Sequence, residues 1–174
     1  MPKSSRKQID DDEKKVIREL QKNSKESIDK IAKKCGFSRQ KVWRIIKRLE
    51  KNKTIWGYHA VVDNEKIKMK SYILLLKRTN VPIGNNIDKI LKDSLDQIGK
   101  QVNVNVHLNS YLHGIYDWML CFTAEDIRHA KKFSEILTRE FSKYISEIHI
   151  LEEIFPIRKC GSANPNIAKL KEFF

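Results

Sequence analysis

The most constraining feature of the sequence is a short helix, a glycine and a strongly basic second helix within residues 24–51. Apolar residues at helical spacing predict the short helix, with Ser24 or Ser27 as its N-cap and Gly36 at its end. Ser38 is placed to cap the basic helix, which we expect to run to about Lys51. The chain is therefore expected to turn sharply between two helices at this point.

A third helix is predicted upstream, from about Asp10 to Asn23. Val16, Ile17 and Leu20 recur at helical spacing and give it one apolar face. Asp10 opens a run of four acidic residues, and negative charge is favourable at the N-terminal end of a helix. Together the three helices form a small bundle with a helix-turn-helix.

The basic helix has two distinct faces. Val42, Ile46 and Leu49 are spaced four and three residues apart, so they share a buried side. The second helix of such a motif enters the major groove of DNA, where early residues reach base edges and later basic residues meet phosphates. The predicted contacts with double-stranded DNA are, near bases, Arg39, Gln40 and Arg44 with Trp43 beside them; at phosphates, Lys47, Arg48 and Lys51; and, at the helix start, Ser38 and Lys41.

A solvated basic face with no DNA partner is the alternative interpretation, and it usually holds for an isolated charge run. The distribution of charge favours DNA. Residues 1–60 carry 18 Lys and Arg against 8 Asp and Glu, a net charge of +10, whereas residues 61–174 carry 17 against 14, a net charge of +3. The basic excess therefore coincides with the turn and the capped helix.

The helical spacing of apolar residues ends at Asn52 and Lys53. Residues 54–63 are rich in β-branched and aromatic side chains and predict a wing strand that leaves the helical bundle. From residue 70 onward, strand and helix signals alternate in the order βαββαβ, which is a ferredoxin-like fold. The expected elements are strands at 71–77, 102–108, 117–123 and 145–157, with helices at 86–100 and 124–141.

The strand at 102–108 alternates strictly. Its valines and Leu108 are expected to point one way, and Asn103, Asn105 and His107 the other. The strands at 72–76 and 118–122 are instead apolar at consecutive positions, so both faces of the sheet are apolar. Large exposed apolar patches are unusual on monomers, which favours a homodimer formed through the sheet. Cover by the C-terminal tail is the alternative.

Particular motifs resemble the Lrp/AsnC (feast/famine) transcription regulators of archaea and bacteria. The matching residues are Gly36-Phe37-Ser38, Val42, Ile46 to Glu50, Ile55, Gly57-Tyr58, Val61 to Asp63 and, in the second half, Gly114 to Asp117. Two positions depart from the family. Lys53 replaces a usual glycine, so Asn52 is expected to take the left-handed conformation instead, and Ile45 stands where a basic residue is common.

The resemblance covers about residues 9–158 and implies an α+β protein: an N-terminal winged helix-turn-helix domain followed by a ferredoxin-like regulatory domain. It implies dimers through the sheets, with possible assembly into higher even-numbered oligomers. It also implies a small effector, such as an amino acid, bound between subunits near Gly114, Tyr116 and Asp117. A purely structural turn, with Gly114 in the bend and Asp117 as its cap, is the alternative at these positions.

The expected domains are residues 1–63 for DNA binding with the wing strand, 64–70 as a linker, 71–158 for effector binding and dimerisation, and 159–174 as an extension. In that extension, the apolar residues from Ile167 to Phe174 form one face of a short helix, which either docks on another subunit or frays in solvent.

Several classes of protein are not expected. The three cysteines, Cys35, Cys121 and Cys160, match neither a disulfide framework nor a zinc pattern and indicate reduced thiols in a cytoplasmic protein. No run approaches the roughly 18 apolar residues of a membrane span. The five histidines and six scattered glycines form no catalytic, metal or phosphate motif, so neither an enzyme nor a cofactor is expected.

The sequence therefore predicts a sequence-specific, DNA-binding transcription regulator modulated by a small effector. An architectural DNA-binding protein of the same fold, without a ligand, is the first alternative. A basic module that binds structured RNA is the second.

Overall fold

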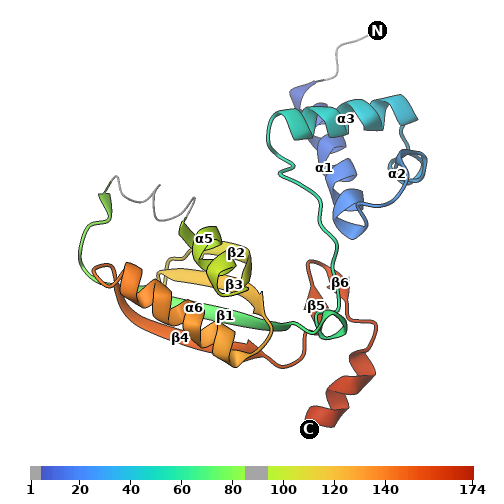
Figure 1. Ribbon diagram of the computed structural model, residues 1–174. Helices are drawn as coiled ribbons and strands as arrows, with labels where there is room; N and C mark the ends of the chain where they lie inside the picture. The colour runs from blue at the N-terminus through green and yellow to red at the C-terminus, as the bar shows by residue number, and fades with distance from the viewer. Residues whose placement is uncertain (1–4, 85–93) are drawn as a thin grey trace. The chain divides into compact units, whose positions relative to one another are not determined.

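The computed structural model describes residues 5–84 and 94–174 of the chain (Figure 1). Contacts divide it into two units. One unit comprises Met1–Val61 together with Ile157–Phe174, and the other comprises Val62–Pro156. Each unit has its own hydrophobic core.

The first unit contains the three predicted helices, α1 (Arg6–Lys22), α2 (Ile28–Cys35) and α3 (Arg39–Lys51). They pack around one another with Val16 of α1, Ile31 of α2 and Val42 of α3 fully or almost fully buried. Figure 1 shows α3 crossing α1, with α2 beside them. The predicted helix-turn-helix is therefore present.

Local capping explains where α2 and α3 begin and end. The Ser27 and Ser38 hydroxyls accept hydrogen bonds from the backbone N–H groups of Lys30 and Lys41, at 3.3 and 3.2 Å. Gly36 ends α2 in the left-handed conformation, with φ of 69°. The predicted turn is confirmed in these details.

The prediction for the start of α1 is wrong by four residues. The helix begins at Arg6, and Ser5 caps it by accepting a hydrogen bond from the N–H of Gln8 at 3.2 Å. The acidic run that opens at Asp10 therefore lies in the second turn of the helix and beyond. One member of the run, Asp12, is buried.

The end of α3 also differs from expectation. Lys53 itself takes the left-handed conformation, with φ of 61°, whereas Asn52 has φ of −86°. The Asn52 side chain accepts a hydrogen bond from the N–H of Thr54 at 3.2 Å, and this local turn needs no left-handed residue at position 52. Residues 54–63 form no strand, since none of the described strands pairs with them.

The second unit is a four-stranded antiparallel sheet with two described helices. In chain order its main elements are β1 (Lys70–Arg78), α5 (Ser94–Gln101), β2 (Asn105–Tyr111), β3 (Trp118–Ala124), α6 (Ile127–Glu140) and β4 (Ile145–Glu153), preceded by the short helix η1 (Glu65–Ile67). The strand order in the sheet is β2-β3-β1-β4. This arrangement confirms the predicted ferredoxin-like βαββαβ fold.

The strict alternation predicted for residues 102–108 is wrong. Asn103 has φ of 54°, and β2 begins only at Asn105. The pairing of β2 with β3 then shifts between Val106 and Leu108, so Val106 lies opposite Phe122 but Leu108 lies opposite Cys121. This bulge turns Leu108 to the face opposite Val106.

Part of the predicted helix at 86–100 lies outside the described residues, including Ile87, Ile90 and Leu91. The described part, α5, buries Leu95 and Ile98 as expected.

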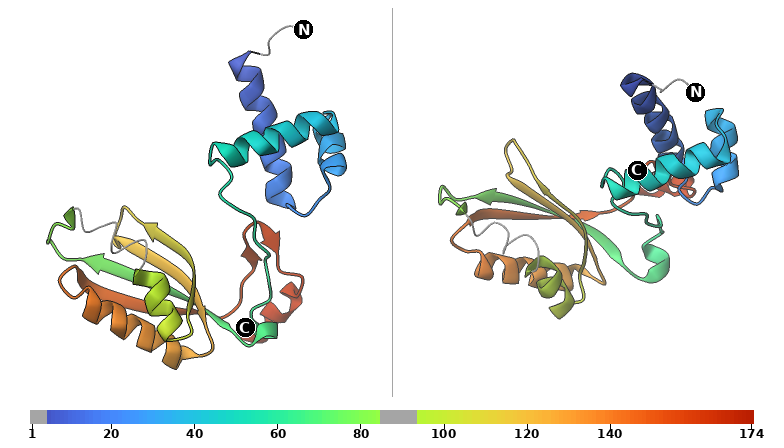
Figure 2. Two further views of the ribbon diagram at one scale, coloured as in Figure 1. Left: turned by 45° about the horizontal axis from the view of Figure 1, so that its top comes forward. Right: turned by 90° about the horizontal axis from the view of Figure 1, so that it is seen from above.

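The two faces of the sheet have different surroundings. Helices α5 and α6 lie on the same side (Figure 2), where Leu74, Phe122 and Phe133 form the centre of a buried core. The opposite face carries partly exposed apolar side chains, described below as the open face: Ile73, Leu75, Leu108, Met119, Cys121 and Leu151.

The C-terminal segment forms a two-stranded hairpin and a short helix. Strands β5 (Arg158–Lys159) and β6 (Ser162–Ala163) are joined by Cys160 and Gly161, whose φ angles of 45° and 84° are both positive, as in a type I′ turn. The 3₁₀ helix η3 (Ile167–Phe173) follows, and Phe174 is fully exposed.

Within the described residues, no helix is long and apolar enough to cross a membrane, and no cluster of potential metal ligands occurs.

Candidate DNA-binding interface

The buried face of α3 is wider than the sequence indicated. Val42, Ile46 and Leu49 are buried as predicted, and Ile45 is buried with them. Position 45 therefore belongs to the core. A face of four buried side chains anchors α3 firmly on the bundle and fixes which residues point outward.

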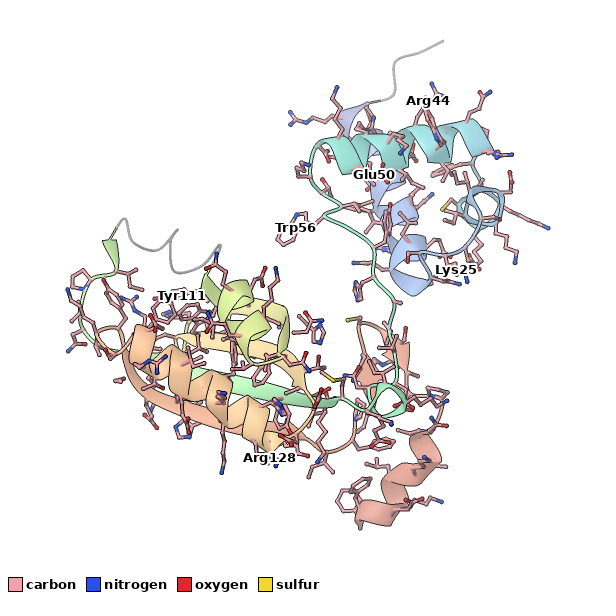
Figure 3. The ribbon with its side chains drawn as sticks, viewed as in Figure 1. Lys25, Arg44, Glu50, Trp56, Tyr111 and Arg128 are labelled. Atoms are coloured by element: carbon pink, nitrogen blue, oxygen red, sulfur yellow. The ribbon has the colours of Figure 1, made fainter. Side chains whose placement is uncertain are left out.

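The outward face is a polar stripe, defined here as Gln40, Arg44, Lys47 and Lys51. These residues follow one another at intervals of four, three and four, so they form one line along the helix, opposite the buried face. All four are exposed, and Arg44 projects from α3 in Figure 3. Sequence reasoning had assigned Gln40 and Arg44 to bases and the two lysines to phosphates.

The side chains of the polar stripe make few and weak contacts with the rest of the protein. The Arg44 Nε donates a long hydrogen bond of 3.4 Å to the carbonyl of Gln40, one turn earlier in the same helix. The Lys47 ammonium lies 2.9 Å from the Glu50 carboxylate, which lowers the pKa of Glu50. Glu50 also accepts a hydrogen bond of 3.2 Å from the hydroxyl of Tyr58. Exposed contacts of this kind are easily exchanged for a phosphate.

Lys41 lies on the flank of α3 that faces α1. Its ammonium is 2.6 Å from the buried Asp12 carboxylate and 4.0 Å from the centre of the Phe37 ring. Gln8 donates a second hydrogen bond to Asp12 at 3.0 Å. Burial alone would raise the pKa of Asp12, but the bonds from Lys41 and Gln8 outweigh it and hold that pKa below its usual value of 3.8.

Two other predicted DNA contacts also have protein partners. The Arg48 guanidinium donates to the Glu13 carboxylate of α1 at 2.7 Å, and Arg39 lies 3.6 Å from Asp29 of α2. Sequence reasoning missed Asp12 and Glu13 as partners of α3. Asp12 lies four residues before the core residue Val16, so its helical spacing carried the only sign of an inward position.

Two tryptophans of the first unit are exposed. The Trp43 side chain, predicted beside the base contacts, is 50% exposed. Trp56, labelled in Figure 3, lies beyond the end of α3 and is 94% exposed. Ser38, the remaining predicted residue, serves as the N-cap of α3.

The predicted effector residues lie in and beside the turn between β2 and β3. The Asp117 carboxylate accepts a hydrogen bond from the backbone N–H of Arg78 at 2.8 Å, which fixes the turn to β1. The Tyr116 ring lies 5.6 Å from the His149 ring, edge to face, and the Lys77 ammonium lies 5.6 Å from its centre. A Cβ at Gly114 would meet no atom within 4 Å.

The His107 ring of β2 lies 3.0 Å from the Thr123 hydroxyl of β3.

Known sequences resemble the first unit. A family model described as "Winged helix-turn-helix DNA-binding" matches residues 9–55. An uncharacterized HTH-type transcriptional regulator of Pyrococcus abyssi is 42% identical over 55 residues, which are 32% of this chain and 36% of that protein. The chain therefore aligns with about a third of the length of this relative.

Solved structures resemble nearly the whole chain. An AsnC family transcriptional regulator from Agrobacterium tumefaciens has a TM-score of 0.65 at 19% identity, covering 90% of this chain and 97% of its own. A feast or famine regulatory protein from M. tuberculosis, complexed with L-methionine, has a TM-score of 0.63 at 16% identity, covering 87% and 95%. All three relatives are described as regulators and none as an enzyme. The predicted resemblance is confirmed at the level of the fold: residues 9–55 match a winged helix-turn-helix family model, and the chain has the fold of the Lrp/AsnC (feast/famine) regulators.

Proposed function

We propose that the protein is a sequence-specific transcription regulator that inserts α3 into the major groove of DNA. The observation that carries this proposal is the polar stripe, because four exposed polar or basic side chains lie in line opposite four buried ones. Such a helix is held by its inner face and is free to present its outer face to base edges and phosphates.

Selection of preferred sites from random duplex DNA tests this proposal most directly. Enrichment of a defined half-site is expected, with binding that weakens as salt rises because phosphate contacts release counterions. Lys47→Ala should reduce the salt dependence by about one ion and weaken binding to all duplexes similarly. Lys14→Ala is the matched control, since Lys14 is an exposed lysine of α1. Equal affinity and salt dependence for Lys47→Ala and wild type would contradict the phosphate assignment.

We also propose a homodimer formed through the open face of the sheet. Ile73 and Leu75 of β1 lie beside Met119 and Cys121 of β3 on the side that carries neither α5 nor α6. Burial against a second copy would remove this apolar surface from water. A symmetric dimer would present two α3 helices, so the preferred DNA site should be roughly palindromic.

Leu75→Asp tests this dimer, because a carboxylate in the centre of an apolar interface lacks a partner. The variant should be monomeric by light scattering and should lose most of its affinity for a two-half-site duplex. Ile127→Asp is the control, since Ile127 begins α6 on the covered side of the sheet, where an acidic residue is tolerated. A dimeric Leu75→Asp variant would move the interface elsewhere.

We further propose an effector of the amino-acid class, bound between subunits near Gly114, Tyr116 and Asp117. Support comes from the fold shared with the M. tuberculosis regulator, whose structure holds L-methionine. Effector binding would change the DNA affinity by favouring one arrangement of the subunits.

Thermal unfolding with each amino acid in turn separates a regulator from the architectural alternative. A bound effector raises the unfolding temperature by mass action and should change the DNA affinity in the same experiment series. Tyr116→Ala should abolish that shift. Indifference to every amino acid would favour the architectural protein, and preference for structured RNA over duplex DNA would overturn both.

A further inference from the structure

One apolar side chain interrupts the charged surface of α3. Trp43 is half exposed, four residues after Arg39 and four before Lys47, so it lies directly beside the polar stripe. The core of the unit is filled by other residues of the same helix, including Val42 and Ile46. Trp43 is therefore not needed to close the core.

Among the described residues, no aromatic ring stacks on the Trp43 ring and no cation lies over its face, whereas Phe37 and Tyr116 both have such a cation. A large apolar surface that stays in water on a DNA-facing helix is costly unless a partner covers it.

We propose that Trp43 reads the 5-methyl group of a thymine in the major groove. This inference rests on the proposed function and adds the base that one side chain selects. Thymine is the only one of the four DNA bases that presents a methyl group there, whereas the others are distinguished by their hydrogen-bond donors and acceptors. An indole ring offers an apolar surface that matches a methyl group.

Trp43 is the tryptophan placed for this contact. It belongs to the second turn of α3, among the residues of a recognition helix that reach base edges. Trp56 is more exposed but lies beyond the end of α3, in a segment without regular structure. The two tryptophans therefore provide a matched pair for experiments.

Replacement of thymine by deoxyuridine tests the inference without changing the protein. The exchange removes only the methyl group and keeps the base pair and the backbone. In the preferred site of the wild-type protein, one thymine in each half-site should be sensitive. Replacement of that thymine by deoxyuridine should weaken binding about fourfold, which corresponds to the free energy of burying one methyl carbon. A selected site without thymine, or one in which every thymine tolerates the exchange, overturns the inference.

Protein variants then assign the methyl contact to Trp43. Trp43→Ala should bind the thymine and deoxyuridine duplexes equally, because the methyl group has lost its partner. Arg44→Ala and Trp56→Ala should keep the fourfold difference, whatever their overall affinity. Discrimination that persists in Trp43→Ala overturns the assignment, and circular dichroism verifies that each variant is folded.

The outcomes distinguish the two proposals. Failure of the wild-type chain to bind any duplex would overturn the proposed function and this inference with it. Specific binding with no effect of the methyl group would overturn the role of Trp43 alone.

Discussion

Two pairs of basic residues on α3 have the same chemistry and different surroundings. Lys41 and Arg48 lie on the flank of the helix and bind carboxylates of α1, at 2.6 and 2.7 Å. Arg44 and Lys47 lie on the outward face, and their contacts are confined to α3. A basic side chain of these two pairs therefore has one of two roles, depending on whether it faces α1 or solvent.

The comparison shows why net charge alone does not define a DNA interface. An acidic residue of α1 already neutralises each flank residue, so a phosphate would have to compete for it. Arg44 and Lys47 can bind a phosphate or a base without breaking an ion pair to another helix. We therefore expect the flank pair to affect the stability of the bundle, and the outward pair to affect DNA affinity.

The largest effect on stability is expected for Lys41→Ala. This change leaves the Asp12 carboxylate buried with only Gln8 as a partner, and an uncompensated buried charge is costly. Because Lys41 is itself partly exposed, the free energy of unfolding should fall by about 2 kcal/mol, less than for a fully buried pair. Urea unfolding measures the change, with Lys51→Ala as the exposed control. A variant as stable as wild type would remove the distinction between flank and outward face.

Arg44→Ala should show the opposite pattern. Loss of a guanidinium that contacts a base edge should weaken the preferred site by about 1–3 kcal/mol more than random DNA. The free energy of unfolding should hardly change, since Arg44 makes only one long hydrogen bond within its own helix. Paired binding titrations on the selected site and on random DNA measure the difference. Equal losses on both duplexes would exclude a role in base readout.

The contrast between these residues also marks the limit of sequence reasoning. Caps and turns are local, so Gly36 and Ser38 defined the end of α2 and the start of α3 correctly, and Ser27 was one of the two caps expected for α2. The inward position of Asp12 depends on Lys41, which is 29 residues away in sequence, and no local pattern contains that pairing. The acidic run that opens at Asp10 therefore predicts a helix start at the wrong place, since the actual cap is Ser5.

The same limit applies to the sheet. The order of strands and helices followed from periodicity, because alternating and helical patterns are properties of short segments. The bulge at Val106–Leu108 depends on pairing with β3, and it reversed the expected direction of Leu108. The outward residues of α3 were predictable from spacing alone, whereas the partners of Lys41 and Arg48 required the packed bundle.

Acid should destabilise the wild-type bundle through Asp12. The pKa of Asp12 is lower in the folded chain than its usual value of 3.8, so its ionised form stabilises the fold above that pH. This contribution should disappear as the pH falls below about 4 and the carboxylate takes up a proton. Unfolding temperatures of wild type and Asp12→Asn, measured from pH 6 to pH 2, should converge at the acid end. Parallel curves over the whole range would contradict the role of Asp12.

The smallest effect is expected for Arg48→Ala, although this residue also binds α1. About half of the Arg48 side chain is exposed, and its partner Glu13 is not fully buried, so water compensates each charge when the other is removed. The free energy of unfolding should therefore fall by only about 0–1 kcal/mol. Equilibrium unfolding of Arg48→Ala, Glu13→Ala and the double variant isolates the pair. A coupling energy of about 2 kcal/mol, as large as the effect expected for Lys41→Ala, would contradict this expectation. The presence of a carboxylate partner on α1, and not the burial of that partner, would then determine how much a basic residue of α3 stabilises the bundle.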